Sequence, residues 1–191
     1  MLQRAAVLIG VKKTGGLPVL NAVQSGLDQM KAWAAAQPGM TDPNGVPRIE
    51  VLSDESGTEV TATAVRKAIK KFVDDGTIEQ LIVYFAGHGA NVNYNEYWLL
   101  SGAPEDANEA VNLEGSKPIA RQCGIPHVVL ISDACRTAAA SIQSQAVQGS
   151  IVFPSKPPRG SPGCVDVFYA TLVGQPALEV SDATAADRFE A

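Results

Sequence analysis

Short apolar runs mark the strands of this chain. Four of them predict buried strands over residues 5–11, 49–53, 80–86 and 127–132, and a fifth candidate strand covers residues 165–172. The first, third and fourth runs are nearly continuous and lack the alternation of a half-exposed strand. Continuous apolar strands are typical of a parallel sheet that has both faces covered by helices.

Two helices are predicted between these strands. Residues 21–36 and 61–75 place apolar side chains at the i, i+3, i+4 spacing of an amphipathic helix, and Thr61 is suited to cap the second helix. Strands that alternate with helices of this length indicate an α/β fold. We expect a mostly parallel central sheet flanked by helices on both faces, in a single domain over residues 1–191.

Two long stretches do not fit this alternation. Residues 89–118 are predicted to be irregular, with a small hairpin around residues 97–100. Residues 149–163 contain four prolines among serine and glycine, which predicts an exposed loop that is open to proteolytic nicking.

Charge and composition exclude several classes of protein. Lys and Arg number 15 against 20 Asp and Glu, so the net charge of −5 offers no basic excess for nucleic-acid binding. The apolar run at residues 5–11 is too short for a signal peptide, and no run reaches the roughly 18 residues of a membrane span. Three cysteines do not suggest a disulfide framework. We expect a soluble, cytoplasmic protein that binds neither membranes nor nucleic acids.

The candidate chemistry lies at the ends of two predicted strands. His88 follows the third strand and Cys135 follows the fourth, at the sheet edge where parallel folds bind ligands. A thiol needs a partner that promotes its thiolate, and a histidine at a neighbouring strand end supplies one. Gly87 and Gly89 allow a sharp turn beside the imidazole. The backbone N–H groups of Gly89 and Cys135 are candidate donors for an oxyanion hole.

Each residue taken alone has a simpler interpretation. A single cysteine is usually a small buried hydrophobe, and a His-Gly pair often only ends a strand. The joint placement of His88 and Cys135 at two strand ends favours a functional role.

A zinc site competes for the same residues. Cys123 and His127, together with Cys135, Cys164 or His88, offer enough ligands for a metal ion. Their spacing matches no common zinc motif, and His127 opens a strand whereas His88 closes one. We therefore expect no metal site, and we expect no other cofactor.

Two motifs carry a resemblance to a known family. YFAGHG at residues 84–89 and SDACR at residues 132–136 resemble the caspase-like cysteine peptidases, which include caspases, metacaspases and bacterial relatives. His88 precedes Cys135 by 47 positions, near the roughly 50 of caspases. The chain keeps the A-C-R of the caspase signature, but Asp133 replaces its Gln and Thr137 its final Gly. The similarity extends from about Gln3 to Glu179.

This resemblance implies a cysteine endopeptidase. Cys135 would attack the scissile carbonyl, and His88 would shuttle protons to the leaving amine. Asp133 matches the acid that lines the S1 pocket in metacaspase-like members, which implies cleavage after basic P1 residues, with Arg preferred over Lys. The alternative for Asp133 is a capping or loop carboxylate. A second pocket acid is absent, because Ser25 stands where it is expected and Asp28 is out of register.

Three further expectations follow from the resemblance. Arg159, in the proline-rich loop, is a candidate site of self-cleavage. Related domains continue beyond the fifth strand, so we expect the last elements of the fold to be missing or supplied by an activating partner or second chain. The alternative to a peptidase acting on protein or peptide substrates is a non-catalytic interaction or regulatory module on the same fold.

Overall fold

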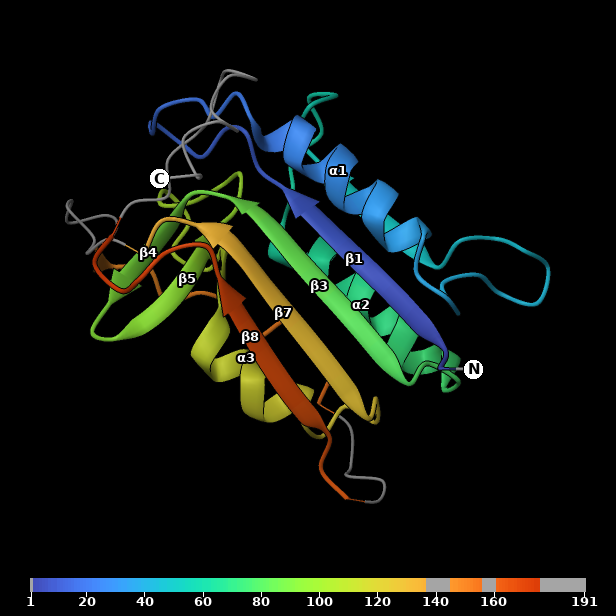
Figure 1. Cartoon of the computed structure of the whole chain (residues 1–191). Coiled ribbons are helices and arrows are strands. Elements are labelled where there is room, and N and C mark those ends of the chain that lie inside the picture. The colour runs from blue at the N-terminus through green and yellow to red at the C-terminus, as the bar shows by residue number, and fades with distance from the viewer. Residues whose placement is uncertain (1, 137–144, 156–160, 176–191) are drawn as a thin grey trace, which may run out of the picture.

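Five parallel strands form the central sheet of this protein (Figure 1). The structure is a computed structural model that describes residues 2–136, 145–155 and 161–175. The strand order across the sheet is β2 (Ile49–Ser53), β1 (Arg4–Gly10), β3 (Gln80–Gly87), β7 (His127–Ala134) and β8 (Cys164–Tyr169). The five predicted strands and their parallel arrangement are confirmed.

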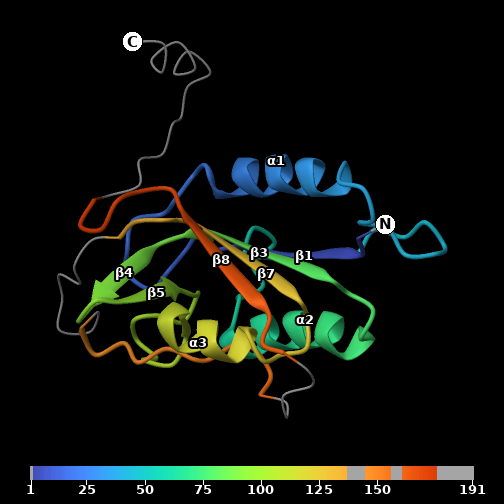
Figure 2. The same ribbon diagram turned by 60° about the horizontal axis from the view of Figure 1, so that its bottom comes forward.

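Helices cover both faces of this sheet, which confirms the α/β fold class. Helix α1 (Val23–Ala35) lies on one face, over β1, β2 and β3, and helices α2 (Ala62–Asp75) and α3 (Leu113–Ala120) lie on the other (Figure 2). The Thr61 hydroxyl caps α2 by accepting a hydrogen bond from the N–H of Ala64 at 3.1 Å, as predicted. None of the helices in the described ranges is long and apolar enough to cross a membrane.

The prediction that residues 89–118 are irregular is wrong. This segment forms an antiparallel sheet of β4 (Gly89–Val92), β5 (Asn95–Leu99) and β6 (Ala110–Asn112), and then begins α3. The predicted hairpin is present, although it starts at Gly89 and turns at Asn93 and Tyr94. Both turn residues have positive φ without a glycine, and α3 contains Pro118, so the usual sequence signals were missing.

Part of the proline-rich stretch is also not an exposed loop. Val152 and Phe153 are almost fully buried in the core on the α2 and α3 side of the main sheet. The apolar run of Ile151, Val152 and Phe153, bounded by Ser150 and Pro154, was too short a signal for burial. The expectation about missing final elements stays a prediction, because residues 176–191 lie outside the described ranges.

One aromatic side chain joins the two sheets. The Trp98 ring of β5 stacks on Phe85 of β3, with ring centroids 5.1 Å apart, and its indole N–H donates to the Ser132 hydroxyl of β7 at 2.9 Å. Phe85 and Ser132 lie near the carboxyl ends of β3 and β7. The small sheet is therefore fixed against the edge where His88 and Cys135 follow.

Candidate active site

Neighbouring strand ends bring His88 and Cys135 side by side. Strands β3 and β7 pair in parallel up to Gly87 and Ala134, so His88 and Cys135 occupy the next position of the same register. Adjacent strands lie about 4.8 Å apart, which brings the two backbones close together. Both residues are partly buried. The arrangement suits a nucleophile and a proton-transfer partner.

A backbone carbonyl orients the imidazole of His88. Nε2 of His88 lies 2.7 Å from the carbonyl oxygen of Pro18, and a carbonyl only accepts, so the ring proton of neutral His88 is on Nε2. Nδ1 then carries the lone pair that is able to take a proton. The sequence analysis missed Pro18 because a backbone carbonyl leaves no signal in the side-chain pattern.

At least three hydrogen bonds hold the loop that carries Pro18. The Asp54 carboxylate, which follows β2, accepts from the backbone N–H groups of Lys12 and Lys13, each at 2.8 Å. Leu20 closes the loop by donating its N–H to the carbonyl of Lys12 at 3.0 Å. The position of Pro18 above His88 is thus set by the strand ends of β1 and β2.

Gly89 is required where β4 passes Cys135. A Cβ at this position would lie 2.4 Å from the Cys135 carbonyl oxygen and 3.0 Å from the Ala134 Cβ. His88 makes the first hydrogen bond of the β4–β5 pairing, since its carbonyl accepts from the N–H of Leu99 at 2.9 Å. In an antiparallel ladder the next residue directs its N–H away from the partner strand. The N–H of Gly89 is therefore not used by β5.

For the peptide hydrolysis that the sequence predicts, replacing Gly89 with alanine is expected to lower kcat/KM at least tenfold. The new methyl group would meet a backbone oxygen that cannot move aside, so the chain after His88 must shift away from Cys135. Peptide hydrolysis by the purified variant measures the effect. Gly16→Ala is the matched control, since a Cβ there meets nothing within 4 Å. Full activity in the Gly89 variant would show that this close approach is not needed.

Asp133 lines a cleft beside α1. The cleft has a volume of about 530 Å³, and its walls include Met30 and Trp33 of α1 and Phe168 of β8. Asp133 is exposed, and one of its carboxylate oxygens accepts from the Tyr84 hydroxyl at 2.9 Å. Burial, and then the Asp133 charge, raise the pKa of Tyr84, so its hydroxyl stays protonated as a donor.

The second acid does not reach this cleft. Asp28 lies on the exposed face of α1, where it accepts a hydrogen bond from Gln24, and Ser25 accepts one from Gln29. Among the described residues that line the cleft, Asp133 is the only acid. Asp133 belongs to β7, and it is not the N-cap residue of any helix in residues 2–136, 145–155 and 161–175.

The residue after Cys135 makes a nearly buried ion pair that the sequence analysis also missed. Arg136 contacts the Glu96 carboxylate of β5, and their side chains are 14% and 9% exposed. The guanidinium lies 3.8 Å above the ring of Tyr169 in β8, and it donates to the Thr171 carbonyl at 3.2 Å. Burial, and then the Glu96 charge, raise the pKa of Tyr169 to about 12. This cluster ties the backbone beside Cys135 to both sheets.

The remaining predicted residues are not brought to this site. Arg159 lies outside the described residues. Cys123 is buried, and His127 is at the opposite end of β7 from Cys135, beside Cys164. The catalytic roles of His88 and Cys135 and the pocket role of Asp133 stay predictions.

Comparisons with known proteins agree with this architecture. A family model described as the caspase domain matches residues 3–187. The structure resembles caspase-1 from Spodoptera frugiperda with a TM-score of 0.59 and 9% identity, over 94% of this chain and 63% of that chain. It also resembles protein GSU0716 from Geobacter sulfurreducens with a TM-score of 0.50 and 20% identity, over 72% of this chain and 52% of that chain. This chain thus spans less than two thirds of either structure, and no curated protein matches its sequence. The match over nearly the whole chain shows that it belongs to the caspase-domain family of cysteine peptidases.

Proposed function

We propose that the protein is a cysteine endopeptidase that uses Cys135 and His88 and cleaves after basic residues. The observation that carries this proposal is the hydrogen bond from His88 to the Pro18 carbonyl, next in register to Cys135. That bond holds the Nε2 proton in place. Nδ1 is left to take the thiol proton and later to give it up.

The reaction then follows the chemistry of a thiol nucleophile. The Cys135 thiol transfers its proton to Nδ1 of His88, and the sulfur forms a bond to the scissile carbonyl carbon. The carbonyl oxygen becomes an oxyanion, for which the N–H groups of Gly89 and Cys135 are the proposed donors. The C–N bond breaks as the leaving amine takes the proton from His88. Water then hydrolyses the thioester and restores Cys135.

The cleft beside α1 is the proposed S1 pocket. Its apolar walls suit the aliphatic stem of Arg or Lys, and the Asp133 carboxylate suits the cationic head. Tyr84 holds one carboxylate oxygen, which leaves the other for the substrate. Asp133 is exposed in the free protein, so solvent weakens the attraction, and we expect about tenfold discrimination between Arg and an uncharged residue.

Peptides that differ only at P1 test this specificity. We expect the wild type to prefer Arg, then Lys, over norleucine, and to cleave after Asp least. Asp133→Asn should remove most of the preference for a charge, mainly through KM, whereas Asp28→Asn, on the exposed face of α1, is the control that keeps it. An unchanged Arg preference in the Asp133 variant would show that this residue does not set specificity.

A non-catalytic interaction module is the second candidate. It is favoured by the exposed apolar side chains of Phe168, Leu172 and Val173 in and after β8, a surface that suits a protein partner or a second chain. Alkylation by iodoacetamide separates the two candidates. A catalytic Cys135 should react much faster than the exposed Cys164, whereas a module has no reason to activate it.

A further inference from the structure

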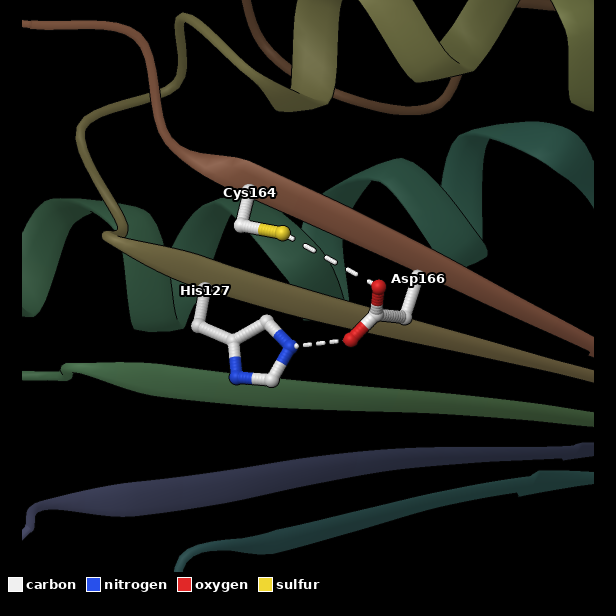
Figure 3. Close-up of side chains that lie close together, drawn as sticks. All are labelled: His127, Cys164 and Asp166. Carbon is white, nitrogen blue, oxygen red and sulfur yellow. Dashed lines mark hydrogen bonds and ion pairs between the residues drawn. The ribbon is translucent and has the colours of Figure 1, made fainter.

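Three potential metal ligands meet at the end of β7 opposite Cys135. His127 and Cys164 are register partners on β7 and β8, and Asp166 follows two residues later on the same face (Figure 3). His127 Nε2 lies 2.9 Å from one oxygen of Asp166, and the Cys164 sulfur lies 3.9 Å from the other. The three ligand atoms lie within 4.8 Å of one another.

The cluster is open to solvent but rests on fixed backbone. Cys164 and Asp166 are exposed, and no helix of the described ranges lies over β7 and β8 on the α1 side of the sheet (Figure 1). Cys164 donates its N–H to the Pro126 carbonyl at 2.8 Å, and His127 donates its N–H to the Glu79 carbonyl at 3.1 Å. An ion therefore has access to side chains whose backbone positions are already set.

We propose that His127, Cys164 and Asp166 bind a zinc-class divalent ion. A thiolate, an imidazole and a carboxylate are the ligand types that zinc accepts, whereas calcium and magnesium require mostly oxygen. Nitrogen and oxygen ligands on tetrahedral zinc lie about 3.3 Å apart, close to the 2.9 Å between His127 and Asp166. The fourth position is left for water.

The hydrogen bonds of the His127 ring must change when a metal ion binds. Arg4 Nε–H donates to the side-chain oxygen Oε1 of Gln80 at 2.7 Å, so the side-chain nitrogen Nε2 of Gln80 faces Nδ1 of His127 at 2.9 Å. In this arrangement Nδ1 accepts, and Nε2 donates its proton to Asp166. An ion on Nε2 moves the ring proton to Nδ1, and Cys164 releases its proton to solvent. Nδ1–H then needs an acceptor. The side-chain oxygen of Gln80 is able to accept only after the amide rotates and gives up its hydrogen bond from Arg4.

The proposed ion cross-links β8 to β7. Strand β8 is an edge of the sheet in the described part of the chain, and it carries Tyr169, which packs under Arg136 next to Cys135. The sequence analysis included His127 and Cys164 among its candidate ligands, but it rejected zinc because the spacing matched no common motif and His127 and His88 lie at opposite strand ends. It did not consider Asp166. The parallel register of β7 and β8 supplies a different set of ligands. This site does not depend on the proposed peptidase activity.

Cobalt binding tests the site in a background that removes the other cysteine–histidine pair. In the double variant Cys135→Ala, His88→Ala, we expect Co²⁺ to produce a thiolate-to-cobalt charge-transfer band that saturates at one equivalent, and Zn²⁺ to displace it. Adding Cys164→Ser should abolish the band, and His127→Ala or Asp166→Asn should weaken binding at least tenfold. Cys123→Ser, at a buried cysteine, is the matched control and should keep the charge-transfer band. Circular dichroism confirms that each variant folds.

A substitution that should improve binding makes the test sharper. Gln80→Glu supplies a carboxylate that accepts from Arg4 and from Nδ1–H together, so we expect zinc to bind about tenfold more tightly. No band in the background variant, or a band that survives Cys164→Ser, would overturn the proposal. Equal or weaker zinc binding by Gln80→Glu would overturn the assigned role of Gln80 in the site.

Discussion

Cys135→Ala is expected to lower peptide hydrolysis by roughly 10³-fold or more, and His88→Ala by a similar factor. The two residues act as one unit in the proposed reaction, so loss of either removes the thiol attack and not only a fraction of it. Both residues follow strand ends and neither lies in the buried core of the main sheet. Their removal should therefore leave the fold nearly unchanged.

The measurement is kcat/KM for an Arg peptide, together with circular dichroism and a thermal melt of each variant. Cys164→Ala, assayed without added metal, is the matched control, because Cys164 is exposed at the other end of the sheet and this variant should keep the activity of the metal-free wild type. Normal turnover by a pure, folded Cys135→Ala protein would rule out the proposed peptidase mechanism and favour the interaction module.

Glu96→Ala is expected to destabilise the protein by about 3 kcal/mol. The substitution leaves the Arg136 guanidinium nearly buried without its counter-charge, and breaking a buried pair in this way is costly. The backbone of Arg136 is also paired, since its N–H donates to the Gln175 carbonyl at 3.1 Å and its carbonyl accepts from Gly174 at 2.9 Å. Disturbing Arg136 should thus also move Cys135 and lower kcat.

Urea unfolding and peptide hydrolysis measure the two effects. A loss of 3 kcal/mol corresponds to a fall in Tm of about 6–12 °C for a domain of this size. Asp74→Asn is the control: its ion pair with Lys70 on α2 is exposed, and such pairs contribute about 0.5 kcal/mol or less. If both variants lose the same stability, the Glu96–Arg136 pair has no special structural role.

Sequence periodicity predicted the main sheet because burial leaves a strong pattern. The apolar runs of β1 and β3 follow directly from strands that are packed between helices, whereas β7 is fully buried only at every second residue, on the α2 and α3 side. The antiparallel strands β4–β6 are three to five residues long, which is too short for a period to emerge. Helix α3 was hidden by Pro118.

Some residues of the candidate site were also predictable from the sequence, and others were not. His88 and Cys135 were found because each follows a recognisable strand, and parallel strand ends meet at one edge. Pro18 acts through its backbone, and Glu96 meets Arg136 across 40 positions of the chain. The cluster at His127 depends on the register of β8 against β7. Such contacts are set by the packed fold and have no local pattern.

The two tryptophans give this chain two separate fluorescence signals. Trp33 is 47% exposed and lines the cleft beside α1, whereas Trp98 is 2% exposed and stacks on Phe85 between the two sheets. An aqueous quencher reaches the indole of Trp33 but not that of Trp98. The long-wavelength emission of the exposed Trp33 therefore reports on occupancy of the cleft. The blue, protected emission of Trp98 reports on whether the small sheet stays docked beside Cys135.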